Sequence, residues 1–117
     1  MTRKDLEMSP GKLSAQAGHA YTDTLCDSIE SHPEAYKAYR TKGLGGSKVS
    51  LHAKNEHQLI RAYNEARLAG LPCSIVVDQH HIMPPKFDGS PIITAIGIGP
   101  CKKEDARSIT KRFNCVK

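Results

Sequence analysis

Apolar residues along this chain recur with two spacings, one typical of amphipathic helices and one typical of strands. Helical spacing covers four segments, at residues 10–31, 33–43, 55–70 and 103–112. Alternating or continuous apolar character predicts three strands, at residues 48–53, 73–78 and 91–99. The segment 79–91 is rich in His, Pro and Gly, and we predict that it is a loop.

Residues at the ends of these segments support the same boundaries. Ser9 is a good N-cap, Pro10 suits the first helical position, and Asn55 caps the third helix. Strands that alternate with helices favour an α/β fold. We therefore expect one domain over residues 1–117, with about four strands in a mostly parallel or mixed sheet and helices packed on both faces. The fourth strand has to come from residues 1–6, and we expect it to be a short edge strand.

The first helix carries the most informative polar pattern. At about 100° per residue, Lys12, Gln16, His19 and Asp23 fall within an arc of roughly 60°. A neighbouring stripe of Leu13, Ala17, Ala20 and Thr24 is the expected core face. A cation, an amide and an imidazole along one edge suit holding an anion and moving a proton. The alternative is that this edge is simply the solvated face of an amphipathic helix.

Asp78 ends the apolar strand 73–78. Ligands of open α/β sheets bind beyond the carboxyl ends of strands, so a carboxylate there is a catalytic candidate, although Asp also caps turns well. His80 and His81 follow closely and raise the alternative of a metal site. Adjacent side chains diverge and no second ligand pair accompanies them, so we do not expect a metal there.

Charge and cysteine content narrow the class of protein. Seventeen Lys and Arg against twelve Asp and Glu give a net charge of +5, which favours polyanionic partners such as nucleic acid but also fits an ordinary basic surface. The four cysteines lack metal-binding spacing, and we expect reduced thiols. No apolar run approaches the ~18 residues of a membrane span and no signal segment is evident. We expect a cytoplasmic protein with no membrane partner.

Several segments together resemble the type II peptidyl-tRNA hydrolase family. The first is Arg3-Lys4-Asp5-Leu6, followed by Gly-Lys-x-x-x-Gln-x-x-His-Ala at residues 11–20. Gly70-Leu71-Pro72, the acid Asp78 and the closing Thr-x-x-Gly-Ile-Gly-Pro at residues 94–100 follow in the family's order and spacing. The match covers nearly the whole chain.

The resemblance implies hydrolysis of the ester that joins a peptide to the 3′ end of tRNA, with no metal or organic cofactor. Lys12 would grip a phosphate or the developing oxyanion, and Asp78 would orient or deprotonate water. Gln16 and Thr94 would fix substrate and water by hydrogen bonds. His19 would either relay a proton or be a buried histidine that locks the helix to the sheet, and tight packing around it favours the second role. The resemblance also implies a homodimer.

Two departures from the family pattern keep alternatives open. Only Met1-Thr2 precedes Arg3, where family members carry a strand of several residues, so we expect a short first strand or one completed by upstream residues. The loop after Asp78 is about four residues longer than is usual in the family and has His80 in place of a glycine. The alternatives are a non-catalytic RNA-binding relative, or a hydrolase of the same fold with a different ester or amide substrate.

Overall fold

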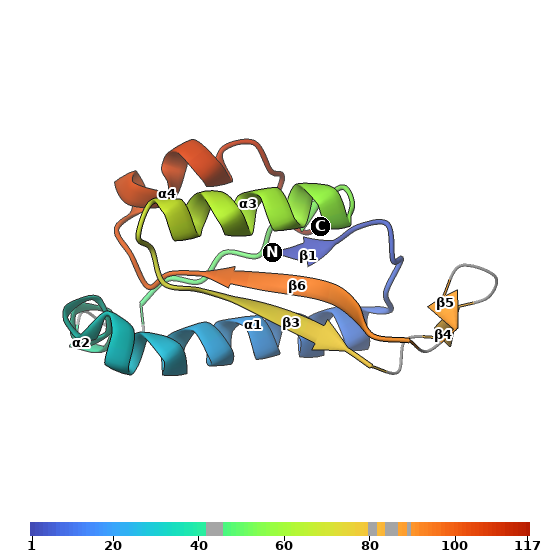
Figure 1. The fold of residues 1–117 in the computed structure, drawn as a ribbon, viewed down its shortest axis with the longest axis horizontal. Helices are drawn as coiled ribbons and strands as arrows, with labels where there is room; N and C mark the ends of the chain where they lie inside the picture. The colour runs from blue at the N-terminus through green and yellow to red at the C-terminus, as the bar shows by residue number, and fades with distance from the viewer. Residues whose placement is uncertain (42–45, 80–81, 84–86, 89) are drawn as a thin grey trace.

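A mixed sheet with helices on both faces makes up the protein, which we describe from a computed structural model covering residues 1–41, 46–79, 82–83, 87–88 and 90–117. The sheet has the strand order β2-β1-β6-β3, with β1 at Thr2–Arg3, β2 at His52–Ala53, β3 at Cys73–Asp78 and β6 at Ile92–Ile98. The helices are α1 at Pro10–Ser31, α2 at Pro33–Thr41, α3 at Glu56–Leu68 and α4 at Lys103–Thr110. Helix α1 lies against one face of the sheet, and α3 and α4 lie over the other (Figure 1). Within the described ranges, no helix combines the length and apolar character needed to cross a membrane.

Strand direction follows from the connections between strands. Strands β1 and β2 are joined through helices and pair in parallel, as helical crossovers require. Strand β6 runs antiparallel to both of its neighbours, β1 and β3. The predicted α/β domain with a mixed sheet is confirmed, with one parallel pair and the other pairs antiparallel. Strands β1, β2 and β3 therefore point in the same direction, and their carboxyl ends lie at the same end of the sheet.

The predicted position of the first strand is wrong. Strand β1 is as short as expected, but it lies inside the sheet between β2 and β6. Backbone bonds hold it from both sides: the N–H of Thr2 donates to the Leu51 carbonyl (2.9 Å), and that of Ile96 donates to the Met1 carbonyl (2.9 Å). Leu6 is fully buried, so this segment contributes to the interior despite its few apolar residues.

Two other boundaries differ from the predictions. The expected strand at residues 48–53 is reduced to His52–Ala53, because Lys48 and Val49 are exposed and lack a neighbouring strand. Within the segment predicted to be a loop, β4 at Ile82–Met83 pairs with β5 at Phe87–Asp88. Strands of two residues are too short to leave an alternating pattern in the sequence. The predicted ends of the helices are confirmed to within about two residues, except that Gly43 lies outside the described residues.

Close packing of α1 on the sheet sets the position of the site described below. Ala20, Thr24 and Ser28 are the buried residues of α1, and Ala20 packs with Val76 and Ala95. A side chain at Gly97 would collide with Thr24 and with the Ala20 carbonyl, so glycine permits this approach. On the other face, Leu59, Ala62 and Ala66 of α3 form a second core with Ala53, Ile96 and Ile109.

Candidate active site

A carboxylate and an ammonium group meet where α1 begins and β3 ends. Ser9 accepts a hydrogen bond from the Lys12 N–H (3.3 Å) and starts the helix, which places Lys12 in its first turn. Asp78 is the last residue of β3, and its Oδ2 lies 2.7 Å from the Lys12 Nζ. The Asp78 side chain is 14% exposed and that of Lys12 31%. The pair is therefore partly buried but open to solvent on the lysine side.

A second polar contact lies one helical turn further along α1. The Thr94 hydroxyl donates to the Gln16 amide oxygen at 2.6 Å, and Thr94 itself is fully buried. Lys12 and Gln16 are four residues apart and share a face of the helix. Their partners come from the adjacent strands β3 and β6. Four of the five predicted site residues, Lys12, Gln16, Asp78 and Thr94, are thus brought together.

A β-bulge directs Thr94 toward α1. The register between β3 and β6 shifts at this point: Val76 pairs with Ala95, whereas Val77 pairs with Ile93, so Thr94 is the extra residue. Ile93 and Ile96 pack into the core beneath α3, but both Thr94 and Ala95 contact residues of α1. In a regular strand, two consecutive side chains point to opposite faces. The bulge allows Thr94 to contact Gln16 while Ala95 still packs under Ala20.

Arg3, for which no role was predicted from the sequence, is buried. Its guanidinium donates to both carboxylate oxygens of Asp5 (3.0 and 2.7 Å) and to the Ile93 carbonyl (3.0 Å). Ile93 directly precedes Thr94 in β6. Arg3 therefore fixes the backbone beside the bulge. The available signal was the pair of opposite charges on Arg3 and Asp5, which lie two residues apart in the sequence.

His19 does not have the structural role that the sequence analysis favoured. It is exposed on α1, so the prediction of a buried histidine locking the helix to the sheet is wrong. The stripe facing the sheet runs through Ala20 and Thr24 instead. Neither the Lys12–Asp78 ion pair nor the Gln16–Thr94 hydrogen bond includes His19. His80 and His81 lie outside the described residues, and within those ranges no three metal-ligating side chains form a group.

Comparison with known proteins connects this geometry to one family. The family model described as "Peptidyl-tRNA hydrolase PTH2" matches residues 1–116. A peptidyl-tRNA hydrolase of Methanocaldococcus jannaschii is 39% identical over 108 residues, which is 92% of this chain and 89% of the relative. Peptidyl-tRNA hydrolases of Methanococcus vannielii (34% identical, 95% and 90% covered) and Sulfolobus acidocaldarius (32%, 94% and 91%) are also similar. The chain, with its polar cluster at the start of α1, belongs to the PTH2 family of peptidyl-tRNA hydrolases.

Proposed function

We propose that the cluster of Lys12, Gln16, Asp78 and Thr94 hydrolyses the ester bond between a peptide and the 3′ end of tRNA. The single observation that carries this assignment is the contact between the Lys12 ammonium and the Asp78 carboxylate at 2.7 Å. It places a proton acceptor and a cation at one open edge of the sheet, in a chain whose family consists of peptidyl-tRNA hydrolases.

In this mechanism, Asp78 accepts a proton from a water molecule whose oxygen attacks the ester carbonyl carbon. Negative charge develops on the carbonyl oxygen, and the Lys12 ammonium stabilises it. The Gln16 amide, whose oxygen is held by Thr94, carries N–H donors that orient the substrate. The bond to the 3′ oxygen of tRNA then breaks, and this oxygen takes up a proton. The products are a free peptide carboxylate and a tRNA with a 3′ hydroxyl.

His19 is the remaining predicted site residue. Its exposure is compatible with the other role considered for it, the relay of a proton at the edge of the site. In that role, His19 would carry the proton that the leaving 3′ oxygen takes up.

Release of peptide from purified peptidyl-tRNA tests this function directly. We expect Asp78→Asn to lower turnover by about 10²–10⁴-fold, the usual contribution of a general base, while tRNA binding is retained. Asp23→Asn removes an exposed carboxylate from the same helix as Lys12 and should leave turnover unchanged. Binding without turnover in the wild type would identify a non-catalytic RNA-binding relative. An active Asp78→Asn enzyme would remove Asp78 from the mechanism.

We further propose that the protein acts as a homodimer in the cytoplasm, where peptidyl-tRNA is formed. Strand β3 supports the dimer, because it is the outermost strand on its side of the sheet and exposes Val77 (51%). Light scattering at micromolar concentration should then give about 26 kDa, twice the chain mass of 12.8 kDa. A monodisperse species of 12.8 kDa would exclude the dimer.

A further inference from the structure

A second concave region lies further along α1, beyond the candidate active site. It is a cavity of about 440 Å³ between the middle of α1, the segment 47–50, the second half of β6 and the start of α4. None of Lys12, Gln16, Asp78 and Thr94 lines it. Its lining on α1 begins at Ala17, directly after Gln16, and continues to Leu25, so the cavity adjoins the candidate active site along the helix.

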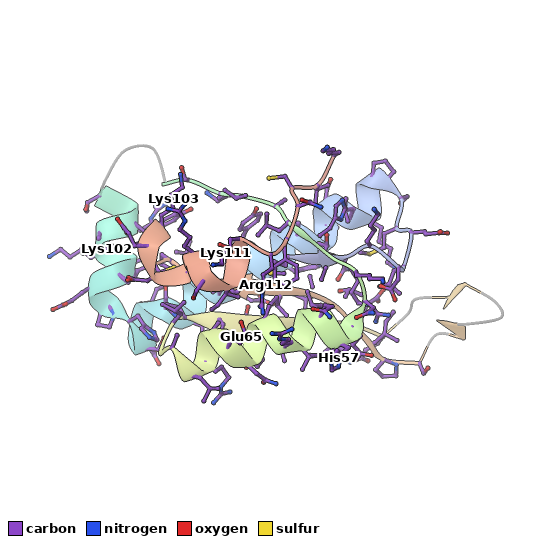
Figure 2. All side chains as sticks on the ribbon, turned by 90° about the horizontal axis from the view of Figure 1, so that it is seen from above. His57, Glu65, Lys102, Lys103, Lys111 and Arg112 are labelled. Carbon is purple, nitrogen blue, oxygen red and sulfur yellow. The ribbon has the colours of Figure 1, made fainter. Side chains whose placement is uncertain are left out.

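Positive charge gathers around this cavity. Lys48, Lys102 and Lys103 are among its lining residues, and no Asp or Glu is among them in the part of the chain that the structure describes. Figure 2 shows Lys102 and Lys103 at the start of α4, on the side where α2 and the segment after residue 46 lie. Burial, and to a smaller extent Asp105, raises the pKa of the Cys101 thiol, so this lining residue stays neutral at pH 7. Three lysine ammonium groups thus contribute positive charge to the cavity wall, and Glu104 and Asp105 follow Lys103 in the first turn of α4.

The inner wall is apolar and partly aromatic. Ile98 and Leu25 contribute aliphatic surface, and Tyr21 and Tyr39 contribute rings. The Lys48 Nζ lies 5.4 Å from the centre of the Tyr39 ring, so a cation and an aromatic face adjoin each other.

We propose that this cavity binds an unpaired nucleotide of the tRNA, with its phosphate on the lysines and its base against the apolar wall. The inference rests on the proposed function, because the substrate has an unpaired 3′ end that passes the active site. Aromatic and apolar surfaces receive the face of any base, and lysines neutralise phosphates. A volume of about 440 Å³ is within the range typical of small-molecule sites.

A different hollow on the surface has the opposite character. It is lined by Asp23, Asp27 and Glu30 of α1, together with Cys26 and Ser31. Three carboxylates would repel a phosphate, so this hollow does not suit the RNA backbone. The lysine-lined cavity, unlike this acidic hollow, can therefore serve together with the active site as a contact point for the RNA along α1.

Binding of RNA to charge variants tests the proposal. Lys102→Ala/Lys103→Ala removes two cations from the cavity. Arg107→Ala/Lys111→Ala removes two exposed cations, one in α4 and one at its C-cap, that do not line the cavity. Fluorescence anisotropy is measured with a labelled single-stranded RNA of the tRNA 3′ sequence and with whole tRNA. We expect at least tenfold weaker binding of both probes for the first variant and less than twofold for the second. Equal losses in the two variants, or no loss in the first, would overturn the proposal.

A second pair of variants tests the base rather than the phosphate. Tyr39→Phe keeps the ring and should bind the RNA like the wild type, whereas Tyr39→Leu should bind it severalfold more weakly. Binding of inorganic tripolyphosphate should be the same in both. Equal RNA binding by the Leu and Phe variants would overturn the placement of the base.

Turnover separates this proposal from the proposed function. For peptidyl-tRNA, Lys102→Ala/Lys103→Ala should raise KM about tenfold and leave kcat unchanged, because these lysines lie outside the reacting cluster. If the wild type releases no peptide, the proposed function fails while the binding results still decide the cavity. A loss confined to kcat would overturn the proposal.

Discussion

Two ion pairs of the same length differ in what surrounds them. Lys12 and Asp78 meet at 2.7 Å where a strand ends and a helix begins, and Arg112 and Glu65 also meet at 2.7 Å, between the segment after α4 and the middle of α3. The first pair joins a point-like ammonium to a carboxylate that is 14% exposed. The second pair is 29% and 33% exposed. Length alone therefore does not distinguish a reactive pair from a structural one.

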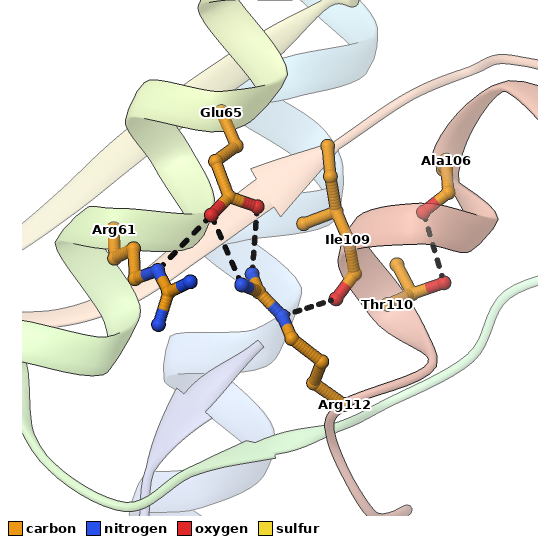
Figure 3. Close-up of polar contacts among 6 residues, drawn as sticks. All are labelled: Arg61, Glu65, Ala106, Ile109, Thr110 and Arg112. Carbon is orange, nitrogen blue, oxygen red and sulfur yellow. Dashed lines mark hydrogen bonds and ion pairs between the residues drawn. The ribbon is translucent and has the colours of Figure 1, made fainter.

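Glu65 links α3 to the segment after α4 through hydrogen bonds to Arg112. Its carboxylate accepts two bonds from the Arg112 guanidinium (3.0 and 2.7 Å) and one from Arg61 (3.1 Å), and Arg112 also donates to the Ile109 carbonyl (3.3 Å), as Figure 3 shows. Such a forked arrangement fixes both partners. A lysine ammonium, unlike a guanidinium, is a point charge on a flexible side chain, so it can move toward a developing oxyanion. The comparison predicts that variants of the first pair change activity and variants of the second change stability.

Removal of the Lys12 ammonium should have the largest effect on activity. We expect Lys12→Ala to lower kcat for peptide release at least tenfold, or about 1.4 kcal/mol of transition-state stabilisation, with little change in Tm. Lys12 lies on the polar edge of α1, and its packing against the core is limited. Peptide release and thermal unfolding of the same preparation measure both quantities. A large fall in Tm with unchanged specific activity would show that the Lys12–Asp78 pair stabilises the fold and has no part in catalysis.

Thr94 should have an intermediate effect, because it acts through Gln16. Thr94→Val removes the hydroxyl that holds the Gln16 amide and keeps the shape of the buried side chain. Loss of one such hydrogen bond corresponds to a decrease of about twofold to tenfold in kcat. Thr94→Ser keeps the hydroxyl and should restore most of the activity. Equal activity of the Val and Ser variants would show that the hydroxyl has no part in orienting Gln16.

Much of the candidate active site can be predicted from local sequence, and the rest depends on tertiary contacts. The N-cap Ser9, the spacing of Lys12 and Gln16 and the place of Asp78 at a strand end are all readable from the chain. The bulge at Thr94 is not, because it arises from the pairing of two strands that are distant in sequence. The exposure of His19 also escaped prediction. The small residues around it indicate close packing, but they do not indicate on which side of the helix that packing lies.

The interior position of β1 escaped prediction for a related reason. Its two residues carry no apolar pattern, yet Thr2 and Arg3 are 1% and 6% exposed. Arg3 is tolerated there because Asp5 and the Ile93 carbonyl satisfy its guanidinium. The Ile93 carbonyl is 90 residues away in the sequence, so the sequence alone does not show that the charge of Arg3 is buried.

Glu65 should show the smallest effect, and on stability only. Glu65→Gln keeps the side-chain shape but removes the charge that Arg112 and Arg61 share, and we expect Tm at pH 7 to fall by no more than about 5 °C, since exposed pairs contribute little. Peptide release should stay within about twofold of the wild type, because Glu65 lies on α3, across the sheet from α1.

The pH dependence of the Tm difference between the wild type and Glu65→Gln shows whether the charge of Glu65 causes that difference. The hydrogen bonds from Arg112, and then the charges of Arg112 and Arg61, lower the pKa of the Glu65 carboxyl below its ordinary value of 4.5. A carboxyl with a lowered pKa in the folded state contributes stability above pH 4.5, and this contribution is lost as the pH falls through the lowered value. The Tm of the wild type and of Glu65→Gln should therefore converge in acid. The Tm of Arg112→Lys, which keeps the positive charge but not the forked guanidinium, should lie between these two values at pH 7. A Tm difference between the wild type and Glu65→Gln that persists in acid would mean that Glu65 stabilises the helix pair by packing rather than by charge.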